Sequence, residues 1–235
     1  MEFTYAEAGI VTLVPARGAD REDARDVECL MTKYEPLCYD VVCDFLPDGA
    51  RAVEIGCFKG GSACILCNGM RRRGKHVSIT CHDLFEPFCV NGKVHDIEQI
   101  FDENTISWKT PVTKAKGDSK ATYDIHPDGS LDYVFIDGDH SYEGALADIR
   151  NFLPKLKKGG WMFIQDGIDG VKQAVEDAIG DSRLKIVIDP PVGHYVNIIG
   201  PDDKLMEYCK KLSNEVDRVH SQDPASWEHM TFGTV

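Results

Sequence analysis

The fold is decided by the stretch Arg51–Leu66, which reads RAVEIGCFKGGSACIL. A short apolar run ends at Glu54 and Gly56, passes through Gly60 and Gly61, and continues into an apolar pattern of helical period. Glycine-rich turns between a strand and a helix receive nucleotide-like ligands, because the backbone N–H groups at the start of the helix face the ligand. The stretch therefore predicts a strand, a ligand-binding turn and a helix in succession.

Strand and helix patterns alternate on both sides of this stretch. Apolar runs predict strands at 52–55, 76–83, 112–117, within 131–140, and at 159–166, 184–189 and 194–199. Apolar residues at helical spacing predict helices at 36–46, 62–73, 96–101, 142–156 and 171–179. Alternation of this kind indicates βαβ units, so we expect an α/β fold with a doubly wound, mostly parallel sheet of seven strands.

Acidic residues follow several of the predicted strands. Glu54 ends the first, Asp83 the second, and Asp137 and Asp166 come at the ends of the fourth and fifth. Ligands of such sheets bind beyond the carboxyl ends of the strands. The sequence therefore predicts that these four strand ends meet in one acidic crevice.

The length of 235 residues suits a single core domain. We expect an N-terminal helical segment at 1–48 that packs on the core, the core itself at 49–200, and a C-terminal helix and tail at 201–235. An irregular insert at 84–111 is longer than the connections of a compact domain usually are.

Charge and cysteine use narrow the function classes. With 26 basic and 39 acidic residues the net charge is −13, which disfavours nucleic acid and acidic membrane surfaces as partners. No apolar run approaches the roughly 18 residues that span a bilayer. The start of the chain lacks the pattern of a signal peptide, so the nine cysteines are expected to be reduced thiols in a cytoplasmic protein. Cys64 and Cys67 form a CxxC, which we interpret as two buried side chains rather than a metal or redox site.

The glycine turn does not fit two common nucleotide sites. Its KGGS order differs from the Gly-Lys-Ser/Thr of a P-loop, and its glycine spacing differs from the GxGxxG of dinucleotide folds. Glu54, two residues before Gly56, is unfavourable beside a dianionic pyrophosphate, whereas it suits a ligand with a cationic amine and a sulfonium. Asp83 is placed to accept hydrogen bonds from two ribose hydroxyls.

Four motifs together resemble one family. VEIGCFKGGSA, HDLF, KGDS and the run from DYVFIDGDH to GGWMFIQD look like those of class I S-adenosylmethionine-dependent methyltransferases. Within that class the chain is similar to the small-molecule O-methyltransferase branch, which includes catechol and macrocin O-methyltransferases and cephalosporin-hydroxylase-type proteins. The resemblance covers about residues 50–200 and implies a Rossmann-like sheet with one antiparallel strand near the C-terminal end.

The resemblance also implies roles for individual residues in binding S-adenosylmethionine. The methionine part would be held by Glu54, Gly56, Gly60 and Ser62. The ribose would be held by Asp83. The adenine would be bordered by Asp118 and Ser119.

The chemistry implied by the resemblance takes place at two strand ends. Asp137 and Asp166 would be the first two ligands of Mg²⁺ or another divalent cation, which lowers the pKa of an acceptor hydroxyl. The family usually has an acid or amide after the second aspartate, where this chain has Gly167. The alternatives for the third ligand are Asp139, Asp169 or water, so the sequence leaves open whether a metal is bound. His140 takes the place of the general base; its alternative role is to cap the following helix.

We therefore predict a methyltransferase that acts on a small molecule, at a hydroxyl of a sugar or phenol. Aromatic side chains of the insert and tail either shape the acceptor pocket or pack in the core: Phe85, Phe88, Trp108, Trp227 and Phe232. His82 and His194 are expected to be structural or pocket-lining. Two other functions remain as alternatives: a non-catalytic cofactor-binding or assembly protein, to which Gly167 gives some support, and an NAD-dependent oxidoreductase. The sequence leaves open whether the protein is a homo-oligomer.

Overall fold

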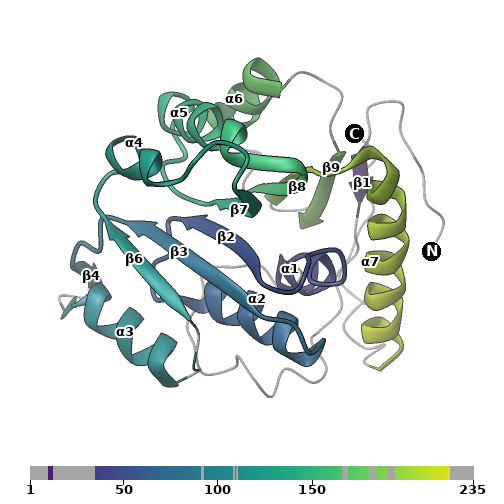
Figure 1. Cartoon of the computed structure of the whole chain (residues 1–235), viewed down its shortest axis with the longest axis horizontal. Coiled ribbons are helices and arrows are strands. Elements are labelled where there is room, and N and C mark those ends of the chain that lie inside the picture. The colour runs from purple at the N-terminus through teal and green to yellow at the C-terminus, as the bar shows by residue number, and fades with distance from the viewer. Residues whose placement is uncertain are drawn as a thin grey trace.

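One mixed sheet forms the centre of the protein, with helices on both of its faces (Figure 1). The structure is a computed structural model that describes residues 10–12, 35–90, 93–107, 109, 111–165, 169–179, 184–189 and 194–222. In the order of pairing, the strands are β1 (Ile10–Thr12), β9 (Leu184–Asp189), β10 (His194–Ile199), β8 (Leu156–Gln165), β7 (Leu131–Ile136), β2 (Ala50–Ile55), β3 (Val77–Asp83) and β6 (Val112–Lys116).

The strand directions confirm the predicted Rossmann-like fold. β10 is antiparallel to both of its neighbours, β8 and β9, and the other pairs in the sheet are parallel. The seven predicted strands are all present. The structure adds β1, which lies in the 1–48 segment where only helix was expected. It pairs with the outer edge of β9.

The helices divide into two layers (Figure 1). One face of the sheet carries α1 (Glu35–Val42), α2 (Gly61–Arg72), α3 (Ile97–Ser107) and α7 (Asp202–Gln222). The other carries α4 (Ser119–Thr122), α5 (Tyr142–Phe152) and α6 (Asp169–Ile179), with short 3₁₀ turns at Tyr123–Ile125 and Leu153–Lys155. The insert folds into α3 and a hairpin of β4 (Phe88–Val90) and β5 (Lys93–His95). No helix in these described ranges is both long and apolar enough to cross a membrane.

The central strand β7 shows why the sequence folds in this way. All six of its residues are buried. Tyr133 and Phe135 pack in the core beneath α1 and α7, while Val134 and Ile136 pack in the core beneath α5 and α6. A strand covered on both faces needs a continuous apolar run, which this segment has from Tyr133 to Ile136.

The parallel register brings three strand ends to one edge of the sheet. Ile55 of β2 pairs with His82 of β3 on one side and with Ile136 of β7 on the other. The residues that follow these strands, Gly56 and Asp137, therefore lie next to Asp83 at the end of β3.

Candidate cofactor and active site

A cavity of about 690 Å³ opens at this edge of the sheet. Its volume lies within the range typical of small-molecule and cofactor sites. Predicted site residues that line it are Gly56, Ser62, Asp83, Asp118, Ser119, Asp137 and His140. Asp166 and Gly167 lie outside the described residues, as do Trp108, Trp227, Phe232 and the side chain of His194.

The turn after β2 can only pass beneath this cavity because it contains glycine. Gly56 has a φ of 80°, and a Cβ atom at this position would lie 1.9 Å from the backbone oxygen of Asp137. Gly60, with a φ of 81°, is the N-cap of α2 and does not line the cavity. The turn therefore packs directly against the end of β7, and it brings the N-terminus of α2 to the cavity.

Glu54 lies behind this turn rather than in the cavity wall. Its side chain is 4% exposed, and its carboxyl group accepts a hydrogen bond from the hydroxyl of Ser62, which does line the cavity. Burial raises the pKa of Glu54 to about 8, so the carboxyl group is largely protonated at neutral pH. Any contribution of Glu54 to the cofactor's methionine part is thus expected to act through Ser62.

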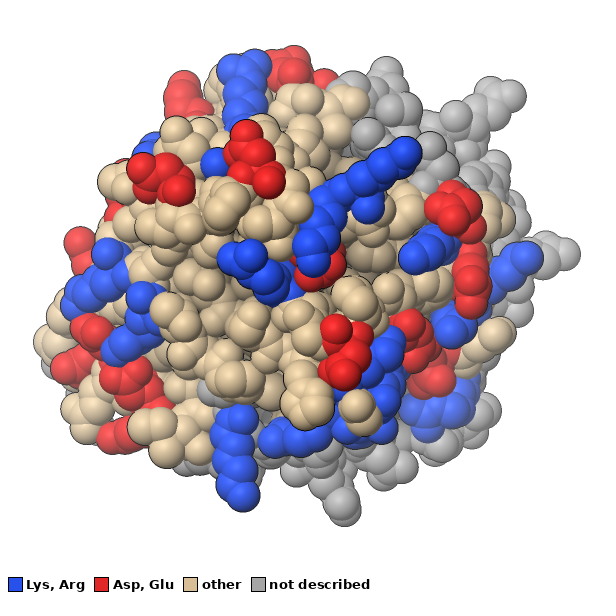
Figure 2. Space-filling model, in the orientation of Figure 1, with Lys and Arg blue, Asp and Glu red and all other residues tan. Residues whose placement is uncertain are grey.

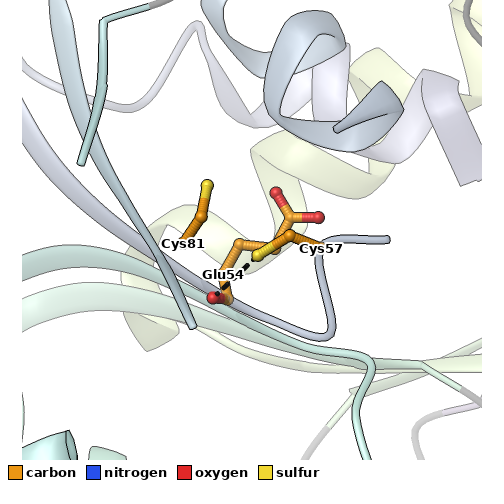
Figure 3. Close-up of side chains that lie close together, drawn as sticks. All are labelled: Glu54, Cys57 and Cys81. Atoms are coloured by element: carbon orange, nitrogen blue, oxygen red, sulfur yellow. Dashed lines mark hydrogen bonds between the residues drawn. The ribbon is translucent and has the colours of Figure 1, made fainter. Parts of the chain in front are cut away.

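Two thiols surround Glu54 (Figure 3). Its carboxylate and the sulfur atoms of Cys57 and Cys81 lie within 4.8 Å of one another, and all three residues are buried. The single S–H proton of Cys57 has two backbone acceptors in reach, the oxygens of Glu54 at 3.3 Å and His82 at 3.6 Å. Burial raises the pKa of this thiol well above the usual range. Because the carboxyl group and this thiol are neutral, we interpret the cluster as packed neutral groups rather than a metal site.

The other cysteines also behave as small buried side chains. No disulfide joins the eight cysteines that the structure describes, and all of them except Cys89 are buried. Cys64 and Cys67 lie on the buried part of α2. This placement agrees with the interpretation of the CxxC as two buried side chains.

Asp83 is held at the end of β3 by backbone donors. Its Oδ2 accepts from the N–H of Phe58 at 2.8 Å, and its Oδ1 accepts from the N–H of Phe85 at 2.7 Å. Each carboxylate oxygen can accept a second hydrogen bond. The carboxylate is therefore fixed in orientation and retains the capacity to bind two vicinal hydroxyls in the cavity.

The segment after β6 forms the next part of the wall. Asp118 is the N-cap of α4, where its Oδ1 accepts from the N–H of Lys120 at 2.9 Å. The hydroxyl of Ser119 donates to Oδ1 of Asp148 at 2.5 Å. Asp148 comes from α5 and also lines the cavity, a position that the motif analysis did not identify.

A chain of three side chains ties this segment to β3. The hydroxyl of Thr122 donates to the backbone oxygen of Asp118 at 3.1 Å, so it accepts from Nδ1 of His82 at 2.8 Å. Nε2 of His82 is then an acceptor, and Nε2 of His126 donates to it at 2.9 Å. Burial and the neighbouring His126 lower the pKa of His82 to about 4, which keeps the ring neutral. His82 is thus both structural and pocket-lining.

The wall next to the glycine turn carries the residues predicted for chemistry. Nε2 of His140 lies 3.2 Å from Oδ1 of Asp137, and both side chains line the cavity. Asp137 therefore supplies one hard oxygen of the kind that Mg²⁺ binds. Asp166, the second expected ligand, directly follows β8, which pairs with β7.

Phe85 and Phe88, the described residues among the aromatic pocket candidates, have different surroundings. Phe85 is buried and its ring packs 5.0 Å from that of Phe101, which makes it part of the core. Phe88 is exposed and contacts Phe58, with 5.7 Å between ring centroids. Since Phe58 lines the cavity, this second pair lies near its rim.

Comparisons with known proteins agree with this fold. Residues 53–167 match a family model described as a methyltransferase domain. These residues form a methyltransferase domain. The matched range begins in β2 and ends just after β8, so it includes the glycine turn, Asp83, the Asp118–Ser119 segment and the Asp137–His140 pair.

The chain is also similar to a curated protein from a virus. It is 26% identical over 158 residues to an uncharacterized protein of Acanthamoeba polyphaga mimivirus. The alignment covers 64% of this chain and 65% of that protein, which is less than two thirds of its length.

Solved structures share the fold at low identity. The O-methyltransferase NovP is 19% identical with a TM-score of 0.53, covering 70% of this chain and 76% of NovP. A precorrin-6y methyltransferase from Geobacter metallireducens is 17% identical with a TM-score of 0.55, covering 78% of this chain and 97% of that one. An rRNA methylase from Streptococcus thermophilus is 10% identical with a TM-score of 0.56, covering 73% and 98%. The predicted resemblance to class I S-adenosylmethionine-dependent methyltransferases is confirmed, whereas the acceptors of these proteins differ.

Proposed function

We propose that the protein transfers the methyl group of S-adenosylmethionine to a hydroxyl group of a small molecule. The observation that carries the proposal is the arrangement of the cavity. The glycine turn and Asp83 lie at the ends of β2 and β3, and the Asp137–His140 pair follows the adjacent β7. One wall thus suits the cofactor, and the neighbouring wall suits acid–base chemistry.

The cofactor would extend along three strand ends. Its methionine part would lie at Gly56 and Ser62, with Glu54 fixing the Ser62 hydroxyl from behind. Its ribose hydroxyls would bind Asp83, and its adenine would lie beside Asp118 and Ser119. This order places the sulfonium and its methyl group at the junction of β2 and β7, close to Asp137.

The proposed reaction is an in-line displacement, for which the enzyme chiefly aligns donor and acceptor. The acceptor oxygen attacks the methyl carbon, the carbon–sulfur bond breaks, and its electron pair returns to sulfur to give neutral S-adenosylhomocysteine. Nε2–H of His140 donates to Asp137, which orients the ring, and the other ring nitrogen, Nδ1, receives the hydroxyl proton. Asp137 and Asp166 are the residues that would hold a divalent cation such as Mg²⁺, whose chemistry there is to lower the pKa of a coordinated hydroxyl.

The charge of the protein supports a small acceptor over a nucleic acid. The net charge is −13, and on the face shown in Figure 2 basic and acidic side chains are interspersed. A protein that binds RNA needs a basic surface for the phosphates. A cytoplasmic location belongs to the same proposal, since the eight described cysteines form no disulfide with one another.

Methyl transfer can be tested with S-adenosylmethionine labelled in its methyl group and a panel of phenols and sugars, with Mg²⁺ or with a chelator. We expect labelled product from the wild-type protein. His140→Ala should lower the rate at least 100-fold, because a general base contributes about 10²–10⁴-fold. His76→Ala, in an exposed loop outside the cavity, should retain the rate.

Two results would contradict the proposal in different ways. An unchanged rate with His140→Ala would remove His140 as the base. If the wild-type protein bound S-adenosylhomocysteine but methylated no acceptor in the panel, the alternative of a non-catalytic cofactor-binding protein would be favoured.

A further inference from the structure

A buried aspartate faces the cofactor cavity from α5 and has no role in the proposed reaction. Asp148 is 2% exposed, yet it lines the cavity. It lies on the same helix face as Ala145, Ile149 and Phe152, which are all buried in the core. A carboxylate on the apolar face of a helix is costly unless it is hydrogen-bonded, which indicates a specific role.

One oxygen of Asp148 determines the orientation of Ser119. Because the Ser119 hydroxyl donates its only proton to Oδ1 of Asp148, the Ser119 oxygen can act only as an acceptor toward the cavity. The side chain of Asp148 thus converts a hydroxyl that could donate or accept into one that accepts.

The other oxygen lies against the loop after β7. A Cβ atom at Gly138, which also lines the cavity, would be 3.4 Å from Oδ2 of Asp148. Among the hydrogen bonds of the described residues, Oδ2 receives none. Burial raises the pKa of Asp148 to about 6, so the group is mainly ionised at neutral pH and requires a donor. Asp148 and Ser119 therefore present acceptor oxygens to this part of the wall, while Lys120, which also lines the cavity, supplies the cation whose charge acts on Asp148.

We propose that Asp148 makes the cofactor site specific for a base with an exocyclic amino group, by accepting a hydrogen bond from the N6 amino group of adenine with Ser119 as a second acceptor. This inference rests on the proposed function, which places the adenine at Asp118 and Ser119. Hypoxanthine has a carbonyl oxygen in place of the amino group. It would put an acceptor against buried acceptors, and a site of this kind rejects such an analogue strongly.

Calorimetric titration with S-adenosylhomocysteine and its deaminated analogue, S-inosylhomocysteine, tests this specificity. The wild-type protein should bind the adenosyl compound about 10–100-fold more tightly. Asp148→Asn keeps the shape but replaces an acceptor oxygen with an N–H donor, so the preference should shrink at least tenfold. Asp132→Asn is the matched control, since Asp132 is also buried but bonds to Arg51 and Lys157 outside the cavity. It should keep the wild-type preference.

The outcomes separate this inference from the proposed function. Equal wild-type affinities for the two compounds, or an unchanged preference in Asp148→Asn, would overturn the role of Asp148 and leave the proposed function in place. Failure of the wild-type protein to bind S-adenosylhomocysteine would overturn both. If Asp148→Asn does not fold, the wild-type comparison still decides, because a site without preference contradicts the inference.

Discussion

At the scale of single residues, the most informative group is a carboxyl group that is neutral at physiological pH. The pKa of Glu54 is raised by burial from 4.5 to about 8 in the folded protein. The folded state therefore binds this proton more tightly than the unfolded state does. The resulting stability is fully present below pH 4.5 and is lost as the pH rises through about 8.

This linkage predicts the effect of Glu54→Gln in the cofactor-free protein. Gln is neutral at every pH and can still accept from the Ser62 hydroxyl. Between pH 6 and pH 9 the wild-type free energy of unfolding should fall by about 2–3 kcal/mol more than that of Glu54→Gln, as measured by urea denaturation. Glu98→Gln is a control, because the pKa of Glu98 is about 2 and the group stays ionised over this range. Parallel pH profiles for the wild type and Glu54→Gln would contradict a neutral Glu54.

At the scale of elements, the β2–α2 turn depends on its close contact with the end of β7. Gly56→Ala adds a positive-φ strain and a Cβ atom 1.9 Å from the Asp137 oxygen. Gly74→Ala, with a φ of +66° and open space around its Cβ, adds the strain alone. We expect Gly56→Ala to lower the free energy of unfolding by at least about 2 kcal/mol more than Gly74→Ala, measured by chemical denaturation. Equal losses in the two variants would show that the contact with β7 is unimportant.

The elements themselves could largely be predicted from the sequence, because each is encoded by its own periodic pattern. The run at Leu131–Ile136 predicted a buried strand, and the acids that follow the strands predicted the edge of the sheet where the cavity lies. Local patterns did not predict β1 or the β4–β5 hairpin. These strands are three residues each, and β1 is stabilised by pairing with β9, far away in the chain.

The candidate site was predicted less completely than the fold. Asp148 and His126 were missed because their roles arise from contacts with Ser119 and His82, which are 29 and 44 residues away in the chain. A local signal for Asp148 existed in its place on the apolar face of α5. Glu54 was expected at the cofactor, but the turn of the chain after Ile55 leaves its side chain behind the glycine loop. Side-chain direction at a turn is set by tertiary contacts that a motif does not specify.

At the scale of the whole molecule, the central claim is that these strand ends together form a site for S-adenosylmethionine. Calorimetric titration of the wild-type protein with S-adenosylhomocysteine, with NAD as the control ligand, tests this claim most directly. We predict micromolar binding of S-adenosylhomocysteine, no binding of NAD, and binding at least tenfold weaker with Asp83→Asn but unchanged with Asp132→Asn, because only Asp83 lines the cavity. Absence of S-adenosylhomocysteine binding, or binding of NAD in its place, would contradict the account.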